Sequence, residues 1–241
     1  MLISIMYHHV NSDRCSNDLK LFEEHLRYIA NNFTSLFPGE KVQQKSVCLT
    51  FDDAYADFFY YIFPLLQKYK LKALLAVPTQ YILDNTNNSK ISRLNFEHND
   101  LFNNYKEATF CTFFELKQML ESGLVQIASH SHSHVNLLQE GVNLEEELVV
   151  SKHILEEKLN IKVNSFVFPF GKYNQEVLKE TLKHYTYAFR IGNAIHKDFN
   201  GINGAIYRVD GDNLKSADEI FTFKRIVGYQ IKGLVKRLGK K

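Results

Sequence analysis

Seven short apolar runs, rich in β-branched and aromatic residues, alternate along the chain with stretches of helical periodicity. The runs are Ile3–Tyr7, Val47–Phe51, Ala73–Val77, Val125–Ser129, Ser165–Pro169, Thr186–Arg190 and Ala205–Val209. Strands joined through helices pair in parallel, because a parallel neighbour requires a long crossover connection. The alternation therefore predicts an α/β fold with a parallel sheet, and both an open doubly wound sheet and a closed barrel satisfy it.

Residues typical of helix starts and stops punctuate the helical stretches. N-terminal caps are predicted at Thr112 (a capping box with Glu115), at Asn143, at Asn174 and at Ser216 (a capping box with Glu219). Gly123 is a helix stop. Residues 84–104 interrupt the alternation and are rich in asparagine and charge. We expect a polar surface insertion there, either mobile or in contact with substrate.

Length and composition fit one domain over residues 1–241. The chain is 45% hydrophobic, enough for a substantial core, and no apolar run reaches the ~18 residues that a membrane helix needs. The N-terminal segment lacks the basic start and cleavage site of a signal peptide. The three cysteines are widely spaced and odd in number. These features favour a cytoplasmic protein without disulfides.

Positive charge is concentrated in a basic C-terminal tail, residues 224–241. The tail holds seven Lys and Arg and no acid, whereas the rest of the chain carries 22 Lys and Arg against 27 Asp and Glu. So acidic a body argues against a nucleic-acid partner. Helical spacing sorts the tail into an apolar face and a basic face: Val227, Ile231, Leu234 and Leu238 against Arg225, Lys232, Lys236 and Lys240. We expect a last helix with its apolar face on the core. The alternative adds peripheral contact between the basic face and an anionic membrane, which would place the site near lipid-linked sugar.

Side chains able to do chemistry follow several of the predicted strands. They are His8 and His9 after the first, Asp52 and Asp53 after the second, His130, His132 and His134 after the fourth, and FPFG (residues 168–171) at the end of the fifth. The carboxyl ends of parallel strands form one rim of an α/β fold, where active sites lie. We therefore expect these groups to converge.

Two imidazoles and a carboxylate form a standard site for zinc or a similar divalent ion. A second carboxylate can act as base, and consecutive aspartates at a strand end point in different directions. The histidine spacing leaves the ligands open: a strand puts all three on one face, whereas a helical turn pairs only His130 with His134. Structural roles are the alternative to metal binding: the two aspartates could be solvated or cap a helix, and the histidines could form a row on a strand that faces solvent. No G-x-S-x-G elbow and no phosphate-binding loop occur.

Three stretches resemble the polysaccharide deacetylases with the NodB-homology domain, carbohydrate esterase family four. They are LTFDDAYADFFYYIFPLLQKYKLKALLAV, GLVQIASHSHSHVNL and FVFPFGKYN, flanked by MYHHV and YRVDGD. The resemblance covers about residues 5–215. It implies a distorted (β/α)7 barrel, which agrees with the seven apolar runs.

The resemblance also implies residue roles. The general base would be Asp52, and the ligands of one divalent metal would be Asp53, His130 and His134. Zinc is the expected ion, with cobalt, nickel, manganese and iron as alternatives. His132 falls at a variable position and Ser131 at that of a supporting hydroxyl. In the FPFG stretch, Phe168 and Pro169 match the groove wall, and the main-chain N–H of Phe170 would face the oxyanion.

Several positions depart from the family pattern. Ala54 replaces a common glycine, and Val167 stands where many members have an arginine that orients the base; Arg208 is a candidate replacement. The chain has no tryptophan and no clear L-x-H motif for the general acid. The candidates for that acid are His8, His9 and His196.

The activity implied is metal-dependent hydrolysis of an N-acetyl group on an amino sugar. Without an export signal, we expect the substrate to be a cytoplasmic glycan precursor, lipid-linked or nucleotide-linked. Two other classes remain open: a metal-dependent hydrolase of O-acyl esters or non-sugar amides, and a non-catalytic glycan-binding domain with a degenerate site.

Overall fold

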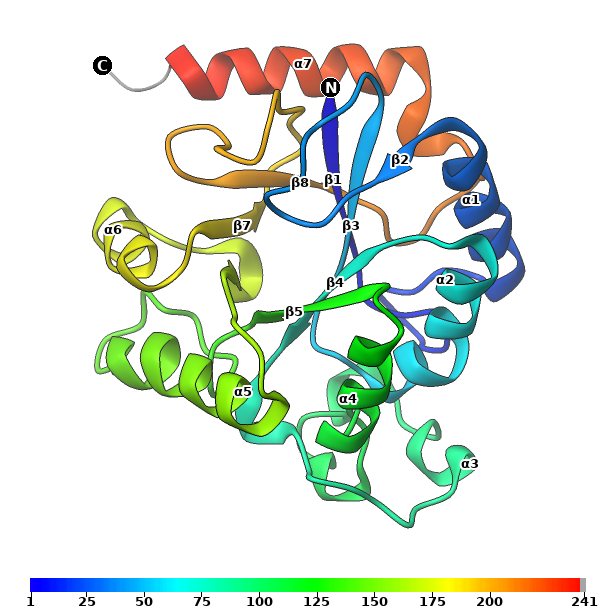
Figure 1. Ribbon diagram of the computed structural model, residues 1–241, viewed down its shortest axis with the longest axis vertical. Coiled ribbons are helices and arrows are strands. Elements are labelled where there is room, and N and C mark those ends of the chain that lie inside the picture. Colours follow the sequence, from blue (N-terminus) through cyan, green and yellow to red (C-terminus); the bar gives the residue numbers. More distant parts are fainter. Residues whose placement is uncertain (239–241) are drawn as a thin grey trace.

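Seven parallel strands close into a barrel in the computed structural model, which describes residues 1–238 (Figure 1). They are β1 (Leu2–Tyr7), β3 (Ser46–Phe51), β4 (Ala73–Val77), β5 (Val125–Ser129), β6 (Ser165–Val167), β7 (Tyr187–Ile191) and β8 (Ile206–Asp210). β8 and β3 both pair with β1, which closes the ring. The two-residue strand β2 (Thr34–Ser35) joins β3 from outside. Of the two folds left open by the alternation, the chain forms the barrel.

Helices surround this barrel. They are α1 (Leu19–Asn32), α2 (Phe63–Tyr69), α3 (Lys90–Arg93), α4 (Phe113–Glu121), α5 (Ser151–Leu159), α6 (Gln175–His184) and α7 (Phe223–Leu238). Short π-helical turns, Phe58–Ile62 and Glu146–Val150, precede α2 and α5. The caps predicted at Thr112, Asn143 and Asn174 are confirmed by their hydrogen bonds. The capping box predicted at Ser216 and Glu219 is wrong. Glu219 accepts the N–H of Lys215, and a single 3₁₀ turn separates this segment from α7.

The two-residue period of the strands sorts their side chains. One set fills the barrel interior and includes Leu2, Cys48, Leu74, Ala128, Val167 and Ile206. The alternate set, including Ile3, Val47, Leu75 and Ile127, packs beneath the helices. Counting on from the inward set in steps of two reaches His8, Asp52, His130 and Arg208. The sheet pleat thus directs polar groups from four strands toward one end of the barrel.

The insertion at residues 84–104 is tied to the body by Arg93, whose side chain is 1% exposed. Its guanidinium donates to the carbonyls of Ala108 and Phe110 and forms two hydrogen bonds, of 2.6 and 2.9 Å, with Glu115. Because Glu115 also caps α4, the insertion and α4 share one buried ion pair. This anchor holds the adjoining residues against the mouth of the barrel.

Helix α7 departs from the sequence expectation. Its buried residues are Tyr229 and Gly233, whereas Ile231, Leu234 and Leu238 are 55%, 55% and 77% exposed. The prediction that the apolar face packs on the core is therefore wrong. The helix instead approaches the barrel through Gly233, where an added Cβ would lie 3.4 Å from the Ile195 carbonyl oxygen. Lys240, predicted on the basic face, lies outside the described residues.

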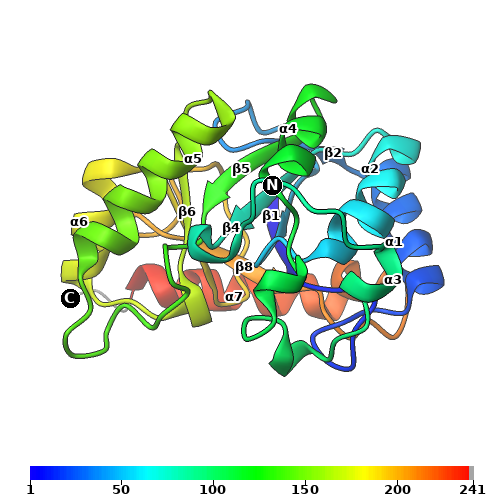
Figure 2. The ribbon, with the colours of Figure 1, turned by 90° about the horizontal axis from the view of Figure 1, so that it is seen from below.

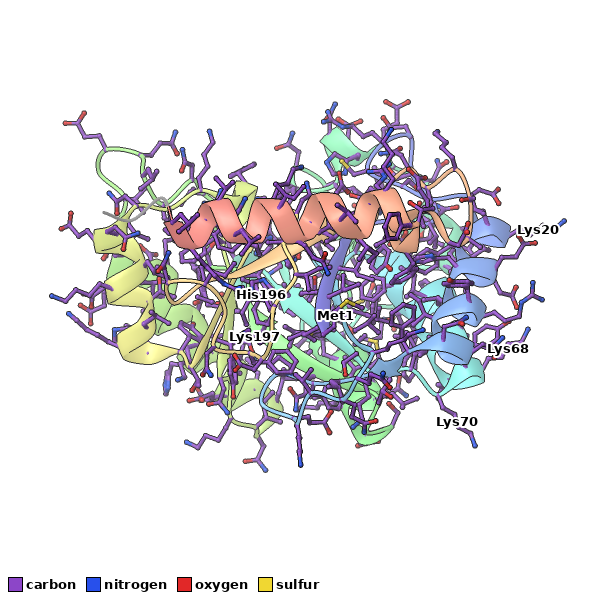
Figure 3. All side chains as sticks on the ribbon, turned by 90° about the horizontal axis from the view of Figure 1, so that it is seen from above. Met1, Lys20, Lys68, Lys70, His196 and Lys197 are labelled. Carbon is purple, nitrogen blue, oxygen red and sulfur yellow. The ribbon has the colours of Figure 1, made fainter. Side chains whose placement is uncertain are left out.

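Figure 3 shows α7 crossing one end of the molecule, with Met1, His196 and Lys197 beside it. A groove of about 480 Å³ lies there, lined by Met1, Ile195, His196, Lys197, Gln230, Gly233, Leu234 and Arg237. In Figure 1, α3 and its insertion lie at the opposite end from α7, and Figure 2 views the molecule from that end. Within residues 1–238, no helix has the length and apolar character needed to cross a bilayer.

Candidate active site

A cavity of about 380 Å³ lies where the loops after the strands meet the insertion. Its walls include His8, Cys15, Asp52, Asp53, Tyr55, His98, Phe102, His130, His134, Phe170, Gly171 and Ile191. The groups predicted to follow the first, second, fourth and fifth strands therefore contribute to one cavity. The insertion adds His98 and Phe102, which the sequence did not assign to the site.

Asp53, His130 and His134 each place one ligand atom within 4.8 Å of the others. Asp53 Oδ1 lies 3.4 Å from His130 Nε2 and 3.1 Å from His134 Nε2. This oxygen is buried and lacks a well-formed hydrogen bond within the described chain. A buried carboxylate oxygen in that state is unfavourable unless a cation balances it. Two imidazoles and a carboxylate therefore fit a divalent metal ion, with room for a further ligand.

The protonation states of this cluster suit metal binding. Burial lowers the pKa of His130 to about 4, so its ring is neutral at pH 7. Nδ1 lies 2.7 Å from the Val167 carbonyl oxygen and donates to it, which leaves Nε2 free as a ligand. Burial alone would raise the pKa of Asp53, but the neighbouring His134 and His130 lower it far below its usual range. A neutral imidazole and an ionised carboxylate are the forms that bind metals.

A turn after β5 selects which histidines meet. Ser131 and His134 adopt left-handed backbone conformations, with φ of 67° and 54°. The Ser131 hydroxyl accepts the His134 N–H at 3.0 Å and closes the turn. His130 and His134 thereby converge on Asp53, whereas the ring of His132 lies 2.9 Å from the Thr79 hydroxyl. Turn geometry, and neither a strand nor a helical period, pairs the two histidines.

Glu147 supports this turn and was missed from the sequence. Its buried carboxylate accepts the N–H groups of His132 and Ser133, at 2.9 and 3.0 Å, and the Ser133 hydroxyl. One feature of the sequence could have revealed it: Glu147 lies four residues before Ser151, so the two share a helical face, and Ser151 is buried.

Arg208 on β8 forms an ion pair with Asp52 inside the barrel. Its Nη1 lies 2.5 Å from Oδ1 and its Nη2 lies 2.8 Å from Oδ2, while Nη1 also donates to the Thr50 hydroxyl. Burial alone would raise the pKa of Asp52, but the Arg208 charge and nearby histidines lower it. Asp52 is therefore an ionised carboxylate in fixed orientation. The resemblance places an arginine at position 167, where this chain has Val167. Arg208 contributes a guanidinium to Asp52 from another strand.

His8 forms a second, half-buried pair, with Asp212. His8 Nδ1 lies 2.6 Å from Asp212 Oδ2, and its main-chain N–H donates to Oδ1 at 3.0 Å. His8 Nε2 lies 3.9 Å from Asp52 Oδ2. Burial alone would lower the pKa of His8, but Asp212, with smaller contributions from Asp52 and Asp53, raises it to about 10. His8 is thus an imidazolium facing the cavity. Asp212 was missed, although it ends the quoted YRVDGD stretch.

The other two candidates for the general acid lie elsewhere. His9 is buried against Tyr55 and contacts Asp57 and His98 through its ring nitrogens. His196 bonds the backbone of Tyr207 and lines the groove beside α7. Of the three histidines, His8 is the one that lines the site cavity.

Aromatic rings border the candidate metal cluster. Phe102 stacks on His134 with a ring separation of 4.8 Å, and Phe170, 58% exposed, lies 4.9 Å from the same ring. Phe168 and Pro169 are buried and do not line the cavity; Phe168 packs on Phe166 and Tyr173.

Strained backbone gathers at this site. Asp53, Ala54 and Phe170 have φ of 69°, 56° and 56°. Non-glycine residues in this region typically cost on the order of 1 kcal/mol or more. A glycine at position 54 would adopt this left-handed backbone without that cost.

Comparison with known proteins matches the sequence to one family and the barrel to solved structures. Residues 39–189 match the polysaccharide deacetylase family. YxkH of Bacillus subtilis (strain 168), a protein named for that family, is 26% identical over 196 residues, which are 74% of this chain and 60% of YxkH. The poly-beta-1,6-N-acetyl-D-glucosamine N-deacetylase of Escherichia coli (strain K12) is 25% identical over 173 residues, 60% of this chain and 25% of that enzyme. The chain thus spans only part of the length of either relative.

Solved structures share the barrel. Streptococcus pyogenes deacetylase PplD, in complex with acetate, has a TM-score of 0.68 at 21% identity, over 91% of this chain and 95% of that one. BC0361, a polysaccharide deacetylase from Bacillus cereus, has a TM-score of 0.72 at 21% identity, over 91% and 67% of the two chains. The family match itself covers more than half of the sequence. This chain belongs to the polysaccharide deacetylase family.

Proposed function

We propose that this protein is a metal-dependent N-deacetylase that hydrolyses the N-acetyl group of an amino sugar in a glycan or glycan precursor. One observation carries the proposal: an ionised carboxylate, an imidazolium and a three-residue metal cluster line a single cavity. They are Asp52, His8, and Asp53 with His130 and His134. Acyl transfer to water needs a base, an acid and stabilisation of an oxyanion.

The residues divide this work. Asp52, fixed by Arg208, would take the proton of the attacking water. His8, protonated against Asp212, would give its proton to the leaving nitrogen. The main-chain N–H of Phe170 would donate to the acetyl oxygen as negative charge develops on it. A divalent ion held by Asp53, His130 and His134 would polarise the acetyl carbonyl and lower the pKa of a bound water toward ~7.

A protonated His8 favours an amide over an ester substrate. An amine leaves a tetrahedral intermediate only after its nitrogen gains a proton, whereas a sugar alkoxide is a better leaving group. An imidazolium 3.9 Å from the base carboxylate supplies that proton at the required place. O-acyl esters and non-sugar amides remain the alternative substrates.

The degenerate-site alternative loses its two supporting arguments. The absent arginine at Val167 is matched by Arg208, which forms a two-point contact with Asp52. The absent L-x-H motif is matched by His8 with Asp212. The Asp52–Arg208 pair is fully buried, and burying a charge pair is unfavourable, so its presence favours a site that still has a role over a degenerate one.

The experiment is acetate release by metal-free protein reloaded separately with Zn²⁺, Co²⁺, Ni²⁺, Mn²⁺ or Fe²⁺. We propose zinc as the native ion, since two imidazoles and one carboxylate suit it. Poly-beta-1,6-N-acetyl-D-glucosamine, named in the E. coli relative, is the first glycan to test, beside O-acetylated glycans and N-acetylated precursors. The Asp52→Asn protein should keep its metal and lose about 10²–10⁴-fold in rate. Acetate release without metal, from esters alone, or undiminished in Asp52→Asn would refute the proposal.

We also propose peripheral contact between α7 and an anionic membrane. The exposed side chains of the helix combine apolar residues with Lys224, Lys232 and Arg237, whereas Lys236 is half-buried over the Tyr207 ring. Arg225 is paired with Glu219, and residues 223–238 contain no acid. An apolar strip with only positive formal charge suits an anionic lipid surface better than a protein of mixed charge.

A further inference from the structure

A second group of ligand-type side chains lies on the cavity wall, separate from Asp53, His130 and His134. His8, Cys15 and Asp212 each offer one ligand atom, and these atoms lie within 4.8 Å of one another. Each of the three is partly exposed. His8 and Cys15 line the cavity itself. A thiol, an imidazole and a carboxylate thus meet at the rim of the site.

Hydrogen bonds fix Cys15 next to Asp212. The loop after β1 folds back on itself, since the His9 N–H donates to the Cys15 carbonyl and the Asn17 N–H donates to the His9 carbonyl. The buried Asn17 side chain then donates to the Gly211 carbonyl at 2.9 Å and accepts the Leu214 N–H at 2.8 Å. Asn17 therefore clamps the Cys15 loop to the segment that carries Asp212. The cluster is built by the fold.

Cys15 differs from the other two cysteines of the chain. Cys48 and Cys111 are buried, at 0% exposure, and burial raises the pKa of both thiols. Cys15 is half-buried beside the imidazole of His8. Of the three thiols, it is the one that a solute in the cavity can reach.

We infer that His8, Cys15 and Asp212 form a second, inhibitory site for a soft divalent cation, with zinc as the fitting ion. Thiolate, imidazole and carboxylate are all zinc ligands, whereas magnesium and calcium prefer oxygen alone. Binding would form Zn–S, Zn–N and Zn–O bonds and release two protons to solvent, one from the Cys15 thiol and one from the His8 imidazolium.

The effect on catalysis rests on the proposed function. An ion bound to His8 replaces the proton that His8 would give to the leaving nitrogen. Zinc would then activate the protein at one equivalent, through Asp53, His130 and His134, and inhibit it at two. Losing the acid should lower the rate by on the order of 10²-fold.

The experiment compares the wild-type protein with Cys15→Ser and with Cys111→Ser as the matched control. The Cys111 thiol donates to the Tyr55 carbonyl, which a serine hydroxyl can also do. Zinc bound per chain is measured by equilibrium dialysis, and Co²⁺ replaces zinc to reveal thiolate ligation by its near-ultraviolet charge-transfer band. Wild type and Cys111→Ser should bind two ions and show the band. Cys15→Ser should bind one ion and show none.

The second readout is the rate of acetate release with two equivalents of zinc divided by the rate with one equivalent. This ratio should be far below one in wild type and Cys111→Ser and near one in Cys15→Ser. A single bound ion in wild type, two in Cys15→Ser, or a charge-transfer band that survives Cys15→Ser would overturn the inference. If no variant released acetate, the proposed function would fail, but ion counts and the cobalt band would still decide on the second site.

Discussion

Arg208 and Asp52, 156 residues apart in the chain, form a two-point ion pair inside the barrel, with hydrogen bonds of 2.5 and 2.8 Å. Arg208 lies on β8 and Asp52 directly follows β3, and β1 alone separates these two strands. A guanidinium can therefore reach the carboxylate from the opposite side of one strand. Arg208 thus fixes the orientation of this carboxylate from a strand that does not carry it.

Arg208→Lys should keep the fold and impair the base, because an ammonium cannot form the two parallel bonds. The pKa of Asp52 should rise as that contact weakens, so the acid limb of the pH–rate profile moves to higher pH. Arg208→Met should destabilise by about 3–5 kcal/mol, since it leaves a buried charge unpaired. The double variant Arg208→Met with Asp52→Asn should recover much of this loss in denaturant unfolding. Additive losses would show that the two residues are not coupled.

The metal cluster predicts different outcomes for neighbouring histidines. His130→Ala or His134→Ala should abolish tight metal binding, because each removes one of three ligands. His132→Ala should leave metal content nearly intact, since the His132 ring bonds Thr79 instead. Elemental analysis of the purified variants makes the comparison. A protein stripped by His132→Ala and not by His134→Ala would reverse the ligand assignment.

Glu147→Gln tests the support beneath the histidine turn. The neutral amide keeps the size of the side chain and weakens its bonds to the His132 and Ser133 N–H groups. Supporting residues of this kind typically contribute about 10–100-fold to metal affinity. Chelator competition should show a loss in that range with all three ligands still present. Glu146→Gln, one residue earlier in the same turn, is the control and should change nothing.

The His8–Asp212 pair predicts a histidine that stays protonated above neutral pH. In the metal-free protein, an NMR titration should place the pKa of His8 near 10, and Asp212→Asn should lower it strongly. Because the native pKa exceeds the unfolded value of ~6.5, His8 stabilises the fold fully below pH ~6.5, and that contribution is lost as pH rises toward 10. A wild-type pKa near 6.5 would contradict this pairing.

Helix α7 predicts salt-sensitive binding to anionic vesicles. Each surface Lys or Arg near the lipid contributes about 1 kcal/mol at low ionic strength. Co-sedimentation should therefore occur in low salt and disappear in high salt. Changing the exposed Lys224, Lys232 and Arg237 to Gln should abolish it, whereas Lys20, Lys162 and Lys179 to Gln, on other surfaces, should not. Dimers that dissolve on Leu234→Ser, without vesicle binding in the wild type, would assign the face to a second copy instead.

The local sequence pattern was sufficient to predict the strands and most helix caps, because both depend on neighbours in the sequence. It could not predict which side chains pair with each other across the barrel. Arg208 and Asp212 act on Asp52 and His8, and those distances depend on how the ring closes. Helical spacing likewise grouped the apolar residues of α7 correctly but carried no information on which way that face points. The choice among the three histidines needed two left-handed residues that no periodic pattern contains.

Strand β1 lies between Met1, in the groove beside α7, and His8 in the site cavity. Its length, about 20 Å, separates the two ends of the molecule. A protein resting on a lipid surface through α7 would hold its catalytic mouth upward into the aqueous layer. Its substrate would then be a chain long enough to extend into the water from wherever it is attached. A sugar lying at the headgroups would be out of reach in that orientation, so a lipid-linked substrate would have to extend its sugar away from the surface to meet the site.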